Sequence, residues 1–164
     1  MLRDKSLIPL SHQHQHALAL CVRIERASPI PSSDLSAWQT EIAQLFRSEI
    51  AAHFAAEEQV LFPVASEDSE SKSLVEDLLN DHQWLGDQFA RSGNEVLSAE
   101  NLNALAQRLS AHIRKEERQL FEGLQKKLSA QRLGQLGAKL ETALKDVPQV
   151  CSRPDETTQL RPRK

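Results

Sequence analysis

The chain has 164 residues, of which 40% are hydrophobic and 26% charged, and its formal net charge is −3. These values are typical of one soluble globular domain and argue against a dominant basic surface for nucleic acid. Its two cysteines, far apart in sequence, form no metal knuckle or disulfide framework, which favours a cytoplasmic location. No apolar run approaches the roughly 18 residues of a membrane span. We therefore expect neither a nucleic-acid nor a membrane partner.

Apolar residues recur at spacings of three and four along most of the chain, which predicts helices rather than strands. Pro29 and Pro31 end the first helix. Pro63 and the polar stretch SEDSESKS follow the second helix, and Gly93 ends the third. The five helices predicted in this way cover approximately residues 10–24, 34–61, 74–90, 102–120 and 129–145.

Four long helices joined by short connections are typical of an antiparallel bundle. The predicted fold class is therefore all-α, an up-down-up-down four-helix bundle with a short C-terminal fifth helix. We expect a single domain over residues 1–147. Residues 148–164 are polar and interrupted by prolines, which predicts a disordered polar tail.

All six histidines lie on the predicted bundle helices. His14 continues the apolar seam of the first helix, whereas His12 and His16 follow its polar face and are expected to be exposed. A role for these two outside the ligand set, as supporting residues or an outer entry site, stays open. One inward imidazole is predicted from each helix of the bundle, at His14, His53, His82 and His112.

Two glutamates share inward faces with histidines. Glu57 follows His53 by four residues, and Glu116 follows His112 by four, a spacing that places both side chains on one helix face. A carboxylate turned inward is costly unless it is paired or bound to a cation. Imidazole and carboxylate together suit iron, manganese or zinc. The predicted metal ligands are His14, His53, Glu57, His82, His112 and Glu116.

A second glutamate follows each of these pairs, in the stretches HFAAEE and HIRKEE. Glu58 and Glu117 are rotated by about 100° from the inward glutamates. We expect them to face solvent or to hydrogen-bond to a neighbouring ligand. Asp81, directly before His82, is expected to cap its helix or to orient the imidazole ring.

The series of one histidine, HxxxE, one histidine and HxxxE resembles the hemerythrin-like, or HHE cation-binding, domain family. LSHQHQHALAL, HFAAEEQVLFP, DHQWL and HIRKEERQLFE are similar to its four helix signatures and span roughly residues 7–145. The resemblance implies a cofactor of two non-heme iron ions bridged by Glu57 and Glu116. Zinc or manganese are the alternative metals. No catalytic residue is predicted beyond the ligands.

One departure from the family bears on function. Oxygen-carrying hemerythrins have a second histidine four residues from the third-helix histidine and an aspartate on the fourth helix. Here Leu78 and Gly86 stand at the positions four residues from His82, and Glu116 takes the carboxylate role. The incomplete ligand set predicts an open position, with space beside Gly86, for dioxygen, nitric oxide or peroxide.

The predicted function is a hemerythrin-like di-iron protein that binds or senses a small ligand, namely oxygen, nitric oxide or iron itself. The alternative is a di-iron redox enzyme such as a peroxide-decomposing, catalase-like protein. A third hypothesis is a structural bundle whose site is vestigial or holds zinc. The sequence leaves open whether the site turns over a substrate, and it indicates no protein partner.

Overall fold

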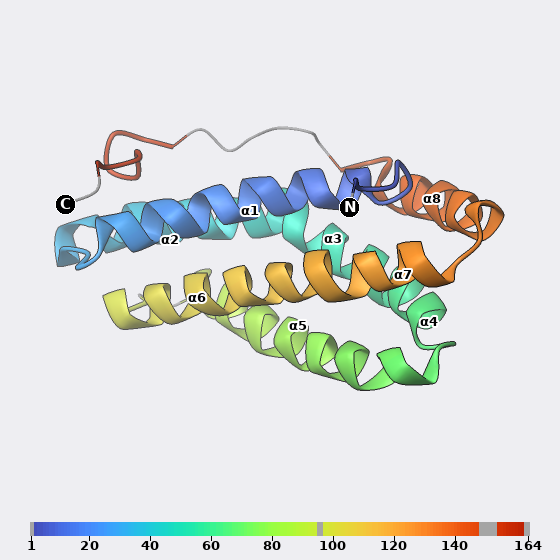
Figure 1. The fold of residues 1–164 in the computed structure, drawn as a ribbon. Coiled ribbons are helices and arrows are strands. Elements are labelled where there is room, and N and C mark those ends of the chain that lie inside the picture. Colours follow the sequence, from blue (N-terminus) through green and yellow to red (C-terminus); the bar gives the residue numbers. More distant parts are fainter. Residues whose placement is uncertain (1, 95–96, 148–153, 163–164) are drawn as a thin grey trace.

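Figure 1 presents the computed structural model, which describes residues 2–94, 97–147 and 154–162. The α-helices are α1 (Ile8–Ala27), α2 (Leu35–Leu45), α3 (Ala51–Ala56), α4 (Phe62–Ala65), α5 (Lys72–Ser92), α6 (Ala99–Lys115), α7 (Phe121–Lys127) and α8 (Ala130–Leu144). Short 3₁₀ turns, Ser32–Asp34 and Ser69–Ser71, precede α2 and α5. Within the described ranges the chain contains no strand.

Three π-helical turns connect α-helices into longer ones. Phe46–Ile50 joins α2 to α3, Glu57–Leu61 joins α3 to α4, and Glu116–Leu120 joins α6 to α7. The bundle thus consists of α1, α2–α4, α5 and α6–α7, with successive members reversing direction (Figure 1). The prediction of an all-α helical bundle is confirmed, and α8 is the fifth helix at one end.

Local sequence explains where several helices begin. Pro9 lies in the first turn of α1, where its missing N–H group is not needed. The side chains of Ser98 and Ser129 accept backbone hydrogen bonds from Asn101 and Arg132, and so cap α6 and α8. Pro63 does not end the second helix, because it falls in the first turn of α4, directly after a π-helical turn.

The buried apolar side chains form two clusters along the bundle. One joins α1, α2, α5 and α6 around residues such as Trp38 and Leu85. The other joins the start of α1 and of α5 to α3, α4, α7 and α8, around Phe121 and Leu140. The six predicted ligands lie where one cluster gives way to the other; His14, for example, falls between Leu10 and Ala17 in the sequence. The two apolar clusters therefore isolate a band of buried polar residues in the middle of the bundle.

Part of the C-terminal segment contacts the bundle. The Arg23 guanidinium donates a 2.8 Å hydrogen bond to the Thr158 carbonyl oxygen, and Thr158 is buried. Arg161 donates a 3.1 Å hydrogen bond to Asp34. Residues 148–153 and 163–164 lie outside the described ranges, so the division into a domain and a disordered tail stays a prediction. None of the described helices has the length and apolar character needed to span a bilayer.

Candidate metal centre

The structure brings all six predicted ligands together in the band between the two apolar clusters. None of the six is more than 4% exposed. Their ligand atoms form two groups, each with all atoms within 4.8 Å of one another, and the two groups share both glutamates. The first group is His14, His53, Glu57 and Glu116, and the second is Glu57, His82, His112 and Glu116.

The imidazole nitrogens converge in pairs. His14 Nε2 lies 3.0 Å from His53 Nε2, and His82 Nε2 lies 3.2 Å from His112 Nε2. Two nitrogens bound ~2.1 Å from one ion at right angles to each other are ~3.0 Å apart. The spacing of each pair is therefore that of two ligands on a single metal ion.

The two glutamates lie between the histidine pairs. Glu57 directs Oε1 to within 3.2 Å of His53 Nε2, and Oε2 to within 3.3 Å of His82 Nε2. Glu116 Oε2 lies 3.2 Å from His14 Nε2 and 3.3 Å from His112 Nε2. Each carboxylate thus lies close to both histidine pairs. We call the pair His14 and His53 one half of the centre and the pair His82 and His112 the other half.

The oxygens of these two carboxylates provide the test of whether metal fits. Glu57 and Glu116 are fully buried, and none of their four oxygens has a hydrogen-bond partner among the described residues. Buried carboxylates without partners are strongly unfavourable in an apolar interior. Cations held between the oxygens and the imidazole nitrogens would satisfy both, so the donor set fits two metal ions.

The helix geometry helps to aim the glutamates. Glu57 and Glu116 are each the first residue of a π-helical turn. Such turns insert an extra residue into a helix and are frequent at functional sites. The two turns occupy equivalent places in the second and fourth helices of the bundle.

The second glutamate of each motif orients a histidine from another helix. Glu58 Oε1 lies 2.8 Å from His82 Nδ1, and Glu117 Oε1 lies 2.7 Å from His14 Nδ1. An Nδ1–H group that donates outward leaves the Nε2 lone pair directed into the centre. Of the two alternatives predicted for Glu58 and Glu117, hydrogen bonding to a ligand is therefore the one observed.

The Nδ1 atoms of His53 and His112 also lie near polar side chains from other helices. His53 Nδ1 lies 2.8 Å from the side-chain oxygen of Gln13. His112 Nδ1 lies 3.6 Å from Asp81 Oδ2, which is too long for a hydrogen bond, so Asp81 acts on this ring as a nearby charge. Gln13 is not among the residues predicted to form the site. Its position directly before His14, like that of Asp81 before His82, is the signal that identifies it.

These contacts relate the halves of the centre by fixed sequence offsets. Residues of the second helix correspond to residues 59 later in the fourth, and residues of the first to residues 68 later in the third. Phe62 and Phe121, the aromatic residues of the repeated LF pairs, obey the rule, since they pack beside His82 and His14. The corresponding pairs are Gln13 and Asp81, His14 and His82, His53 and His112, Glu57 and Glu116, Glu58 and Glu117, and Phe62 and Phe121.

Without metal, two of the four central histidines have raised pKa values and are therefore protonated near neutral pH. Burial alone would lower the pKa of His14, but the Glu116 and Glu117 carboxylates outweigh it and raise this pKa to about 9. Burial is likewise outweighed at His112, where the charges of Glu116 and Asp81 raise the pKa to about 10. Metal binding to these two imidazoles must therefore displace protons near neutral pH.

The pKa values of His53 and Glu57 are shifted toward the neutral form of each group, whereas that of Glu116 is shifted toward the ionised form. Burial and the positive charge of His14 lower the pKa of His53 to about 3. Burial and the negative charge of Glu116 raise the pKa of Glu57 to about 7. Burial would also raise the pKa of Glu116, but His112 and His14 hold it well below its ordinary range. In the absence of metal, Glu116 therefore holds the negative charge that the two protonated imidazoles require.

A small cavity adjoins the centre. Its walls include His14, His53 and His112, and the free space is about 10 Å³, which is room for one water-sized molecule. Apolar side chains such as Phe54 make up much of the rest of the wall. Gly86 does not line this cavity, although a side chain there would meet open space. The space next to the centre is thus on the side of His14 and His53.

The two extra histidines of α1 stand outside the ligand groups. His12 is exposed. The His16 side chain is 29% exposed, and its Nδ1 lies 2.9 Å from Glu49 Oε2. Glu49 is itself buried and lines the small cavity. His14 is therefore the histidine of α1 that meets the other ligands.

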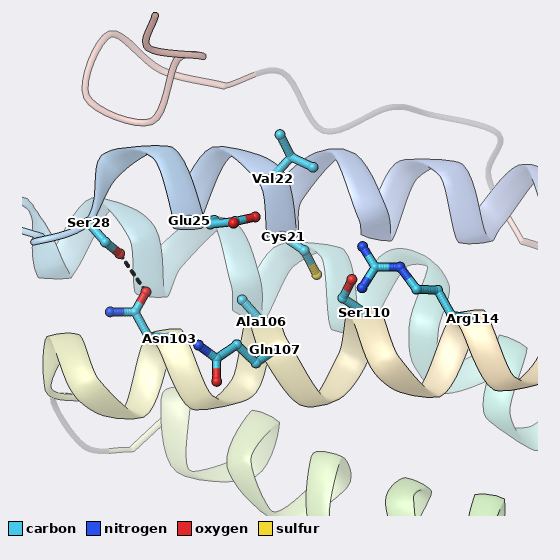
Figure 2. Close-up of a pocket in the computed structure, with 9 residues that line it drawn as sticks. All are labelled: Cys21, Val22, Glu25, Ser28, Asn103, Ala106, Gln107, Ser110 and Arg114. Atoms are coloured by element: carbon cyan, nitrogen blue, oxygen red, sulfur yellow. Dashed lines mark hydrogen bonds between the residues drawn. The ribbon is translucent and has the colours of Figure 1, made fainter. Parts of the chain in front are cut away.

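A wider hollow lies between α1 and α6, away from the centre (Figure 2). Its lining includes Cys21, Ser28, Asn103 and Arg114, and Ser28 donates a hydrogen bond to Asn103 across it. Burial raises the pKa of the Cys21 thiol to about 12, which keeps this thiol neutral and poorly reactive. The hollow shares no residue with the ligand groups.

Comparison with known proteins agrees with this geometry. The sequence profile of the hemerythrin HHE cation-binding domain matches residues 9–124, a stretch that contains all six clustered residues. No curated protein and no solved structure is similar enough to give a match. On the extent of the profile match, the chain belongs to the hemerythrin HHE cation-binding domain family.

Proposed function

We propose that this hemerythrin-like domain holds two non-heme iron ions and binds or senses a small ligand, either dioxygen, nitric oxide or iron itself. The single observation that carries the proposal is the set of four buried carboxylate oxygens on Glu57 and Glu116, which have no hydrogen-bond partner among the described residues and lie in two groups with four imidazoles. A site built in this way is unfavourable without cations. Zinc and manganese accept the same donors and are the alternatives to iron.

The residue roles follow from the two ligand groups. His14 and His53 would hold one ion, and His82 and His112 the other. Glu57 and Glu116 would bridge the two. Bound iron would supply redox chemistry and coordination positions for small ligands. The outer residues Glu58 and Glu117 keep two of the rings in the tautomer that presents Nε2 inward.

The size of the cavity supports a small ligand. A space of about 10 Å³ between Ile50, Phe54 and Leu109 admits a molecule of very few heavy atoms. The partner we propose is accordingly a diatomic gas or peroxide. We also propose a cytoplasmic location, supported by the free, buried thiol of Cys21.

Absorption spectroscopy of the purified protein tests this proposal. After anaerobic loading with ferrous iron and exposure to air, we expect charge-transfer bands and a higher melting temperature than in the metal-free protein. His53→Ala should abolish both changes, whereas His12→Ala, at an exposed position on α1, should keep them. A wild-type protein that shows neither bands nor a stability gain would overturn the proposal.

A second candidate is decomposition of peroxide at the same centre. The observation that favours it is the buried carboxylate of Glu49 in the cavity wall, because a carboxylate accepts hydrogen bonds from O–H groups. Oxygen evolution from hydrogen peroxide by the iron-loaded protein, lost in His112→Ala, would support it. Equal rates in the variant and the wild type would exclude this centre as the source.

A further inference from the structure

The correspondence between the two halves of the centre fails at two neighbouring pairs of positions. By the offsets that relate the ligands, Glu49 corresponds to Arg108 and His16 to Trp84. Arg108 extends over the Trp84 ring, with its Cζ 4.8 Å from the ring centroid, and donates a 2.9 Å hydrogen bond to Asp81. One half of the centre thus has a buried carboxylate where the other has a partly exposed cation.

The backbone differs at the same place. Glu49 lies in the π-helical turn Phe46–Ile50, whereas Arg108 lies within the regular helix α6. The other two π-helical turns match each other across the halves, but this one has no counterpart in the described part of the fourth helix. A π-helical turn changes which residues face inward. In the turn Phe46–Ile50, the neighbouring residues Glu49 and Ile50 are both buried.

One oxygen of Glu49 has no hydrogen-bond partner in the part of the chain that the structure describes. The side chain is 2% exposed, Oε2 is paired with His16 Nδ1 at 2.9 Å, and the buried Oε1 has no hydrogen-bond partner among the described residues. Glu49 lines the small cavity together with His14 and His53. A buried, unpaired acceptor next to a water-sized space calls for a donor that occupies that space.

We propose that Glu49 selects the small ligand of the centre, accepting a hydrogen bond from a ligand that carries an O–H group at the His14 and His53 half. This inference rests on the proposed function, because it requires that the centre bind small ligands. An ionised carboxylate only accepts hydrogen bonds. Dioxygen, nitric oxide and azide have no hydrogen to donate, and a buried negative charge also repels anions such as azide. Hydrogen peroxide is neutral, small and a donor, and it represents the favoured class.

The replacement Glu49→Gln reverses this preference. With His16 still donating to the side-chain oxygen, the glutamine presents its NH₂ group to the cavity, so a donor replaces the acceptor and the negative charge is removed. The dissociation constant for hydrogen peroxide should rise by at least about tenfold, the loss expected for a hydrogen bond to a charged group. The dissociation constant for azide should stay the same or fall.

The experiment uses the full chain loaded with ferric iron and rapid-mixing absorption titrations with each of the two probes. Iron content per chain is measured first for wild type, Glu49→Gln and the matched control Glu25→Gln, which alters an exposed glutamate of α1. Weaker peroxide binding with unchanged or tighter azide binding in Glu49→Gln, and no shift in the control, support the proposal. A peroxide affinity that does not fall, or that falls equally with the azide affinity, overturns it.

Two further measurements keep the test decisive. If Glu49→Gln binds less iron, Glu49→Asp retains the charge but withdraws the acceptor, and it should weaken peroxide binding while leaving azide binding unchanged. In the metal-free protein, Glu49→Gln should not lower the melting temperature, because the glutamine oxygen keeps the hydrogen bond from His16 and the unpaired Oε1 contributes no hydrogen bond to the fold. A marked drop would assign Glu49 a structural role and refute the inference. A wild-type chain that binds no iron would instead refute the proposed function.

Discussion

Glu58 holds His82 from the neighbouring helix, with Glu58 Oε1 2.8 Å from His82 Nδ1. The carboxylate is 45% exposed, yet it fixes a ring that is almost fully buried. The same arrangement joins Glu117 to His14. The two glutamates of each motif therefore have different roles. The first faces the centre, and the second orients a histidine that faces the centre.

This arrangement predicts that Glu58→Ala weakens metal binding without destroying the site. Loss of a residue that orients a metal ligand typically lowers affinity about 10- to 100-fold. Competition with a chelator of known affinity measures the change. Glu76→Ala, at an exposed position of α5, is the control. Identical affinities for Glu58→Ala and the control would contradict the role assigned to Glu58.

Metal removal should reveal the repulsion between the two buried glutamates. Without metal, burial and the charge of Glu116 disfavour the ionised form of Glu57, whose pKa is raised to about 7. Glu57→Gln should therefore raise the melting temperature of the metal-free protein at pH 8, while it weakens iron binding. Thermal unfolding with and without iron compares the two states. A Glu57→Gln protein less stable than wild type in the absence of metal would count against an uncompensated carboxylate.

Stability of the metal-free protein should fall as the pH rises above neutral. His14 and His112 have pKa values of about 9 and about 10 in the folded chain, above the ordinary value of 6.5. Their protonation therefore stabilises the fold fully below pH 6.5, and this contribution is lost as the pH rises through 9 to 10. Circular dichroism melts between pH 6.5 and 10 follow the change.

The iron-loaded protein is the control for that pH dependence. Ligated imidazoles carry no proton on Nε2, so the melting temperature should vary much less over the same range. His53 acts in the opposite direction at acid pH, because its pKa of about 3 lies below 6.5 and stability is lost as the pH falls between these values. A metal-free protein that becomes more stable from pH 7 to 9.5 would refute the charges assigned to His14 and His112.

The C-terminal segment should stabilise the bundle. Arg23 contacts both Glu41, at 3.0 Å, and the Thr158 carbonyl oxygen, at 2.8 Å. Truncation after residue 153 should lower the free energy of unfolding by about 2 kcal/mol, since it removes a buried hydrogen bond to a charged group. Chemical denaturation measures the loss, with a chain that lacks only residues 163–164 as control. Equal stability of both truncated chains would show that the segment contributes nothing.

The sequence predicts the bundle and the convergence of the six residues for a simple reason. Helical phase depends on spacing alone, so the four-residue separation in His53 and Glu57 places both on the inward face of any regular helix. The same rule identifies His14, and not His12 or His16, as the inward histidine of α1. The repeat of the motif then predicts that His53 and Glu57 lie at the same height in the bundle as His112 and Glu116.

The same spacing rule applies to Glu49, which the predicted site leaves out, but it does not reach contacts between helices. Glu49 precedes His53 by four residues, the same separation as in His53 and Glu57, so the spacing rule also places Glu49 on the inward face of its helix. Gln13 was missed for a different reason, because its contact with His53 joins separate helices and depends on how they pack. The position of the cavity next to the centre also depends on packing. The absence of a side chain at Gly86 therefore did not predict where this cavity lies.

The amount of iron bound per chain tests the central claim most directly. The metal-free protein would be loaded with ferrous iron under anaerobic conditions, freed of excess metal, and analysed for iron and protein. We predict two iron ions per chain in the wild type, and clearly fewer when either Glu116 or His53 is replaced by alanine. Retention of no iron by the wild type, or of equal amounts by all three proteins, would contradict a centre built from these six residues.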